Sequence, residues 1–109
     1  MHKYGLHGRL QAKQGHGNAL AAILLQASQL VSSAKGCHLY LVSKDAQDPD
    51  SVWVTEVWDS KEDHDNSLHL EGVGPLIAQA IPLLAGKPEK GAELEVLGGL
   101  PSLIKVQPA

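Results

Sequence analysis

Two different spacings of apolar residues open the chain. From Tyr4 to Lys13, apolar and polar residues alternate, which is typical of a strand with one face in water. After the glycine-rich segment QGHGN, apolar residues recur at the spacing of a helical stripe, at Leu20, Ile23, Leu24, Ala27, Leu30, Val31 and Ala34. Asn18 is a suitable N-cap for this helix, and Gly36 is a suitable stop. We therefore expect a strand followed by an amphipathic helix.

Two segments rich in β-forming residues come next. The segments CHLYLVSKD and VWVTEVW are separated by AQDPDS, a cluster of residues that favour turns. This arrangement predicts a β-hairpin.

The region after the hairpin is helical but interrupted. Ser60 is a suitable N-cap, and the acidic residues Glu62 and Asp63 suit the first turn of a short polar helix that we expect to end near His69. A second helical segment should begin near Pro75, and Pro82 should kink or shorten it because proline lacks a backbone donor.

A final alternating segment, residues 92–96, predicts a last strand. The element order is then βαββαβ, with the second helical region in two pieces. This order indicates an α+β protein of the ferredoxin-like class, with helices on one face of an antiparallel sheet. We expect one domain over residues 1–99 and a tail without a clear pattern over residues 100–109.

The face of the sheet without helices also carries apolar residues. We expect Tyr40, Val42, Trp53 and Val57 to share one face, opposite Leu39, Leu41, Val52 and Val54. An apolar face is most simply covered by a second copy of the chain, so we expect a homodimer formed by sheet-on-sheet packing. The alternative is that polar residues of the first strand, His7, Arg9 and Gln11, keep this face in water.

Composition excludes several classes of protein. The chain has 109 residues, a net charge of -3 and a single arginine, so it lacks a basic surface for nucleic acid. Its apolar runs are too short to cross a membrane. One cysteine and no recognisable leader segment suggest a cytoplasmic protein.

Glu56 is the first candidate for chemistry. It shares a strand face with Val52, Val54 and Trp58, and burial would raise its pKa and make it a usable proton acceptor. The alternative is an acid that is merely paired. Trp58 and Trp53 could form the walls of a pocket for a flat aromatic ligand, or they could belong to the core.

His64 is the second candidate. On an ideal helix it shares a face with Ser67 and Leu68, whereas His69 points away. An imidazole can act as a base near neutral pH, although a solvated surface histidine is the alternative. The spacing of His64 and His69 is not the i, i+4 spacing of a zinc helix, and there is no dinucleotide fingerprint. We therefore expect neither a metal nor a cofactor.

The segment WVTEVWDSKEDHDNSL, followed by LIAQAIPLLAG, resembles the antibiotic biosynthesis monooxygenase family. This resemblance implies a dimeric α+β barrel and a cofactor-independent oxidation of a quinol or related electron-rich aromatic by O₂. Many members carry a histidine where this chain has Ser67. The acid–base residue of the family therefore does not transfer directly, and His64 and Glu56 remain the candidates.

Two other functions fit the same pattern. One is a non-catalytic dimer that binds a small hydrophobic aromatic ligand. The other is haem degradation, which is known among structural relatives and would require a histidine placed to ligate iron.

Overall fold

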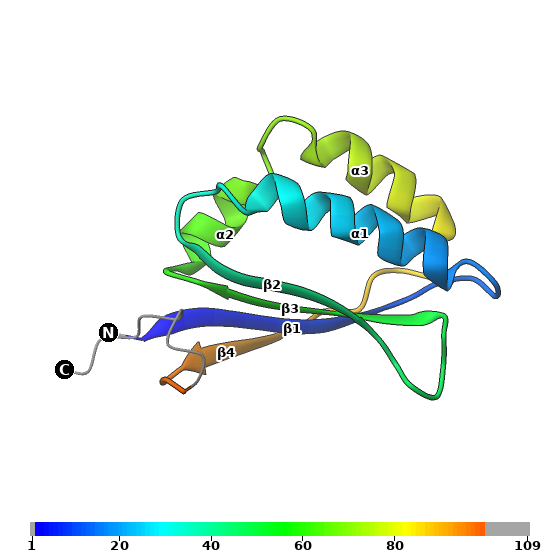
Figure 1. The fold of residues 1–109 in the computed structure, drawn as a ribbon, viewed down its shortest axis with the longest axis horizontal. Coiled ribbons are helices and arrows are strands. Elements are labelled where there is room, and N and C mark those ends of the chain that lie inside the picture. Colours follow the sequence, from blue (N-terminus) through cyan, green and yellow to red (C-terminus); the bar gives the residue numbers. More distant parts are fainter. Residues whose placement is uncertain (1, 100–109) are drawn as a thin grey trace.

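Four antiparallel strands and the helices that cover one of their faces build the protein, which we describe from a computed structural model (Figure 1). The structure describes residues 2–99, so the expected tail of residues 100–109 lies outside the described residues. The elements in chain order are β1 (Lys3–Gln11), α1 (Gly17–Val31), β2 (Cys37–Lys44), β3 (Ser51–Trp58), α2 (Lys61–Ser67), α3 (Val73–Ala80), a 3₁₀ turn, η1 (Ile81–Leu83), and β4 (Ala92–Val96).

The strands lie in the order β2-β3-β1-β4, and every neighbouring pair is antiparallel. The predicted order βαββαβ and the ferredoxin-like α+β class are confirmed. As expected, the second helical region is broken, into α2, α3 and η1.

The register of the sheet decides which residues face the helices. Tyr40 pairs with Glu56 and Val42 pairs with Val54, so both β2 residues lie on the helical side. Our grouping of Tyr40 and Val42 with Trp53 was therefore wrong. Strand composition alone does not fix the register of a hairpin, whereas directly opposed residues must share a face.

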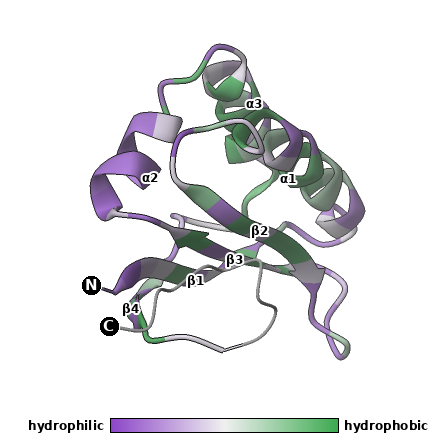
Figure 2. Ribbon diagram, turned by 60° about the vertical axis from the view of Figure 1, so that its left-hand side comes forward, coloured by the Kyte–Doolittle hydropathy of each residue, from purple (hydrophilic) through white to green (hydrophobic). Residues whose placement is uncertain are grey.

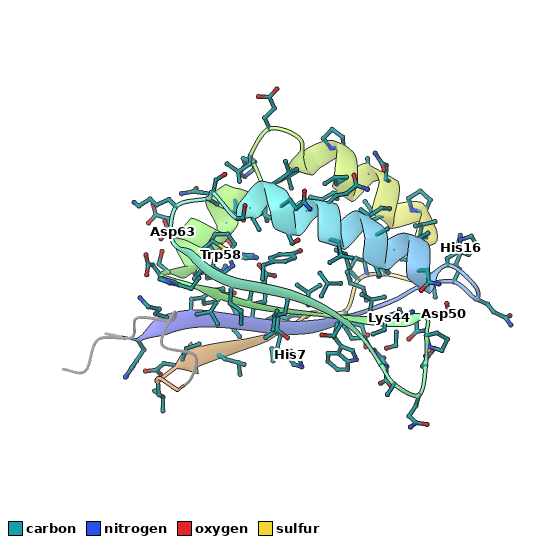
Figure 3. The ribbon with its side chains drawn as sticks, in the orientation of Figure 1. His7, His16, Lys44, Asp50, Trp58 and Asp63 are labelled. Carbon is teal, nitrogen blue, oxygen red and sulfur yellow. The ribbon has the colours of Figure 1, made fainter. Side chains whose placement is uncertain are left out.

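The start of α1 is capped by a residue from the hairpin loop. Asp50 accepts hydrogen bonds from the backbone N–H groups of Gly17, at 2.9 Å, and Gly15, at 3.1 Å. Figure 3 shows Asp50 beside His16 at this helix end. Asn18 is not the N-cap that we predicted, because α1 already begins at Gly17 and the Asn18 side chain accepts a hydrogen bond from Lys44. A Cβ atom at Gly17 would clash with the backbone of the hairpin loop.

The other end of α1 also differs from expectation. The helix ends at Val31, and Gly36 lies in the following turn with a φ of 82°. This is a left-handed conformation that glycine adopts without a steric penalty. Gly36 therefore shapes the entry into β2 rather than the helix end.

The second helical region follows the sequence pattern closely. The Ser60 side chain accepts a hydrogen bond from the Asp63 backbone N–H at 3.1 Å, as a helix N-cap does. Regular α-helix stops at Ala80, and Pro82 lies in the 3₁₀ turn. Figure 2 shows that α2 is mainly hydrophilic, whereas α1 and α3 carry hydrophobic residues.

The best-buried core lies between α1 and the sheet. It consists of Ala12, Leu20, Val52 and Leu84. None of the helices within residues 2–99 is long and apolar enough to cross a membrane.

The contribution of the Asp50 cap to the stability of the protein should be measurable. Asp50→Ala leaves the first N–H groups of α1 without this acceptor, so we expect a loss of about 1 kcal/mol in the free energy of unfolding. Asp50→Asn, which keeps one acceptor oxygen, should lose less. Urea unfolding followed by circular dichroism measures both, and equal stability of Asp50→Ala and the wild type would contradict the capping role.

Candidate active site

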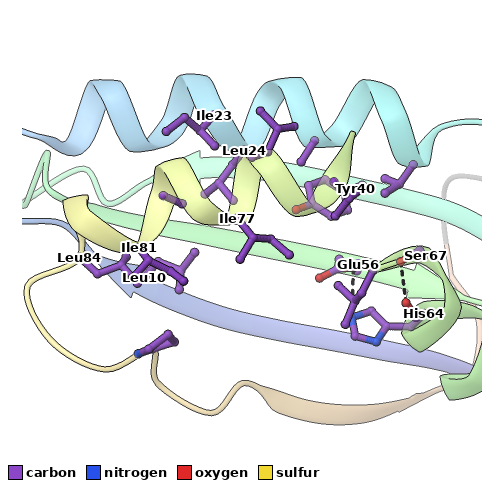
Figure 4. Close-up of a pocket in the computed structure, with 17 residues that line it drawn as sticks. Leu10, Ile23, Leu24, Tyr40, Glu56, His64, Ser67, Ile77, Ile81 and Leu84 are labelled. Atoms are coloured by element: carbon purple, nitrogen blue, oxygen red, sulfur yellow. Dashed lines mark hydrogen bonds and ion pairs between the residues drawn. The ribbon is translucent and has the colours of Figure 1, made fainter. Parts of the chain in front are cut away.

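A cavity of about 200 Å³ lies between the helices and the sheet. Figure 4 shows Glu56, His64 and Ser67 at one end and the aliphatic residues Leu10, Ile81 and Leu84 at the other. Most of the lining is aliphatic and comes from α1, α3 and η1. The polar side chains that line the cavity are Tyr40, Glu56, His64 and Ser67.

Glu56 is a buried carboxyl group with a defined partner. Its position in β3 turns it toward the helices, and only 8% of the residue is exposed. The indole Nε1 of Trp58 donates a hydrogen bond to Glu56 Oε1 at 3.0 Å. Burial raises the pKa of Glu56, while the Trp58 hydrogen bond and the nearby His64 act in the opposite direction. The carboxyl group of Glu56 therefore keeps its proton to a higher pH than the carboxyl group of an exposed glutamate does.

His64 lies between two carboxyl groups. Its Nε2 is 3.7 Å from Glu56 Oε1, close enough for an ion pair when the ring is protonated. Its Nδ1 is 2.9 Å from Asp65 Oδ1. The His64 hydrogen bond, followed by the one from Lys61, lowers the pKa of Asp65. An ionised carboxylate only accepts hydrogen bonds, so this contact places a proton on Nδ1 and leaves Nε2 directed toward Glu56.

Two aromatic rings lie beside the imidazole of His64. The Trp58 ring meets the His64 ring edge to face, with centroids 5.9 Å apart. The Tyr4 ring lies at 5.8 Å. The first contact links Trp58 to both candidate residues, since the same indole binds Glu56.

The remaining predicted site residues divide into two groups. Ser67 and Leu68 line the cavity, and the Ser67 hydroxyl donates a hydrogen bond to the His64 backbone carbonyl at 2.5 Å. Trp58 is fully buried behind Glu56 and is not part of the lining.

Trp53 is not brought to the cavity. It pairs with Arg9 in the sheet and stacks on His7, with ring centroids 4.9 Å apart. Figure 3 shows His7 on the side of the sheet away from the helices. The expectation that Trp53 forms a wall of the pocket is therefore corrected, because odd-numbered β3 residues from Trp53 to Val57 face away from the helices.

Tyr40 is a cavity residue that the sequence did not reveal. It lies directly opposite Glu56 on the neighbouring strand. Burial, with a smaller contribution from Glu56, raises the pKa of Tyr40, so its hydroxyl stays neutral and able to donate. Only the register of the hairpin could have identified it.

Within residues 2–99, no three side chains of histidine, cysteine, aspartate or glutamate gather in a way that could hold a metal ion. The expectation that the protein needs neither metal nor cofactor stays a prediction.

Residues 4–74 match the model of the family described as antibiotic biosynthesis monooxygenase. The chain belongs to this family. The match includes Glu56, Trp58, His64 and Ser67 and ends where α3 begins, so most of the α3 wall of the cavity lies outside it. Among curated proteins, none matches the chain.

Solved structures assigned to the same family have the same fold. One from Chloroflexus aurantiacus J-10-fl is 42% identical, with a TM-score of 0.81 over 91% of this chain and 97% of the other. One from Deinococcus radiodurans is 29% identical, with a TM-score of 0.74 over 90% and 96%. One from Nitrosomonas europaea is 16% identical, with a TM-score of 0.82 over 88% and 91%, and shows the fold alone.

The buried carboxyl group should make stability depend on pH. A carboxyl group whose pKa is raised in the folded state binds protons more tightly than in the unfolded state, so stability falls as pH rises from the ordinary carboxyl pKa through the raised one. Glu56→Gln removes this fall. We expect the variant to gain stability relative to the wild type as pH rises from about 4 to about 8.

Urea unfolding across this range measures the effect, with Glu71→Gln as a control at an exposed position. A difference between Glu56→Gln and the wild type that does not change with pH would contradict the raised pKa.

Proposed function

We propose that the protein is a cofactor-independent monooxygenase that oxidises a quinol or a related electron-rich aromatic with O₂. The observation that carries this proposal is the Glu56–His64 pair at one end of an otherwise aliphatic cavity. Membership of the antibiotic biosynthesis monooxygenase family supports it.

The first step needs only a base and a dry site. His64 Nε2 accepts the proton of a substrate hydroxyl, which leaves an electron-rich anion in an aliphatic cavity. The anion passes one electron to O₂, and the resulting substrate radical and superoxide combine to form a carbon–oxygen bond. Protonated His64 returns its proton to the new peroxide. The carbon that bears this hydroperoxide then loses its proton to the departing hydroxide as the O–O bond breaks, and water leaves. One oxygen atom stays in the product as a carbonyl, and the other is released in water.

The neighbours of His64 suit this role. Asp65 fixes the proton on Nδ1, so the free electron pair of Nε2 is on the Glu56 side of the ring. Once protonated, the ring forms an ion pair with Glu56, whose position is held by Trp58. The transfer of one proton therefore leaves the total charge of the cavity unchanged, because the pair becomes neutral as the substrate becomes an anion.

A non-catalytic binding protein would use the same aliphatic cavity but would not need the imidazole. We expect His64→Ala to lower turnover by roughly a hundredfold or more, and Glu56→Gln to have a smaller effect, because the imidazole supplies the base. Oxygen uptake with a panel of quinols, compared with anaerobic samples, measures both.

Near-wild-type rates in both variants would remove the acid–base role. Ligand binding without oxygen uptake in the wild type would identify the protein as a binding protein.

We further propose that the protein is a homodimer that packs through the sheet face away from the helices. On this face Leu41 and Leu94 are each 51% exposed, and Leu39, Trp53 and Val57 lie beside Leu41 on β2 and β3. Leu41 on β2 and Leu94 on β4 are exposed near opposite edges of the sheet, and Leu39 and Trp53 are half-buried. Apolar residues exposed on a sheet face are typical of an interface between proteins. Sheet-on-sheet packing by a second copy would bury them.

A charge placed on this face should separate the two copies. We expect Leu41→Asp to shift a dimer toward monomer in sedimentation at micromolar concentration, because a carboxylate would be buried in the interface. Leu25→Asp is a matched control, since Leu25 is 52% exposed on α1, away from the sheet face. A wild-type protein that sediments only as a monomer would contradict the proposal.

A further inference from the structure

We infer that the cavity selects a neutral aromatic of one or two fused rings whose hydroxyl groups lie at one end, and that Tyr40 recognises such a hydroxyl by a hydrogen bond. This inference rests on the proposed function for the identity of the cavity as a substrate site. It concerns binding alone and can be tested without turnover.

Charge is the first argument. Among residues 2–99, no lysine or arginine lines the cavity, whereas the carboxyl group of Glu56 does. Arg9 borders an adjoining hollow but is held by Glu89 through two hydrogen bonds, of 2.8 and 3.0 Å. A ligand that carries its own carboxylate would therefore lie near Glu56 and have no lysine or arginine to pair with, which makes its desolvation costly.

The free polar atoms are the second argument. The Ser67 hydroxyl is used by the His64 carbonyl, and Glu56 Oε1 accepts from Trp58. Glu56 Oε2 and His64 Nε2 remain as acceptors at the polar end of the cavity. Both suit a ligand hydroxyl as donor.

Tyr40 supplies the donor at the same end. Its partner in the sheet is Glu56, and none of the hydrogen bonds among residues 2–99 uses the Tyr40 hydroxyl. Burial favours the neutral phenol, so the group keeps its proton at neutral pH. The Tyr40 hydroxyl can therefore donate to the oxygen of a ligand hydroxyl and continue to do so when that oxygen becomes an anion.

Size and polarity define the rest of the ligand. A cavity of about 150 Å³ lined by aliphatic and aromatic residues binds benzene, so the present cavity of about 200 Å³ suits one ring or two fused rings. Its far end is formed by Leu10, Ile81 and Leu84 and offers no hydrogen bond from a side chain. A hydroxyl group placed there would lose its hydrogen bonds to water without replacement. The hydroxyls are therefore confined to the ring at the Tyr40 end.

Three probes of similar shape test the inference on the full chain. α-Naphthol carries the hydroxyl, naphthalene lacks it, and α-naphthoate replaces it with a carboxylate. We expect α-naphthol to bind most tightly by calorimetry or fluorescence and α-naphthoate to bind at least about tenfold more weakly. Equal or tighter binding of α-naphthoate would overturn the inferred charge selection.

Two tyrosine variants test the role of Tyr40. We expect Tyr40→Phe to weaken α-naphthol binding by about fivefold to tenfold and to leave naphthalene binding unchanged, because only a hydrogen bond is removed. Tyr4→Phe is the matched control. Tyr4 also lies beside His64, but its hydroxyl is bound to Glu93 at 2.9 Å and Tyr4 does not line the cavity. Its removal should not change α-naphthol binding.

An unchanged affinity of Tyr40→Phe for α-naphthol, or an equal loss for naphthalene, would overturn the role of Tyr40. The comparison of the three probes on the wild type decides the ligand class even if a variant fails to fold. Absence of oxygen uptake would contradict the proposed oxidation and leave these binding results intact.

Discussion

The burial of one carboxyl group is the constraint on which the candidate site depends. A carboxylate loses much of its hydration when helices cover it, and this cost must be offset by hydrogen bonds or by proton uptake. Glu56 receives one hydrogen bond from the indole of Trp58 and lies within ion-pair distance of His64. Trp58 is itself fully buried, so the carboxyl group is fixed by the same residue that anchors the end of β3 in the core. The core and the site are thus parts of one packing arrangement.

The sequence predicts those features of the fold that depend on local patterns. The alternation in β1, the helical stripe of α1 and the proline at position 82 each act through nearby residues, and the structure agrees with all three. The N-cap of α1 could not be predicted in this way. Asn18 has the right residue type and nearly the right position, but Asp50 supplies the cap from a loop 33 residues away.

The residues of the candidate site also divide into those that local sequence patterns predict and those that depend on distant parts of the chain. His64, Ser67 and Leu68 follow from the period of one short helix, and Glu56 follows from the alternation of one strand. Tyr40 could not be found in this way, because its side of the sheet depends on how two strands align. A one-residue change of register moves every side chain of a strand to the other face. Trp53, the other large residue of β3, was wrongly assigned to the cavity because of its size. Its odd-numbered position in the strand places it on the face of the sheet away from the helices.

Within the described part of the chain, residues 2–99, the cavity lining contains neither lysine nor arginine, which is consistent with the proposed chemistry. A permanent cation would bind a substrate anion tightly and lower its energy, which would make the anion a weaker reductant toward O₂. In the proposed mechanism, His64 gains its positive charge from the substrate proton and is not a permanent cation. The carboxylate of Glu56 then offsets the positive charge of the imidazolium. The substrate anion therefore faces an ion pair, whose electric field is smaller than that of a free cation. The single hydrogen bond inferred for Tyr40 can orient the substrate oxygen without neutralising it, which keeps the anion reactive in a mainly aliphatic cavity.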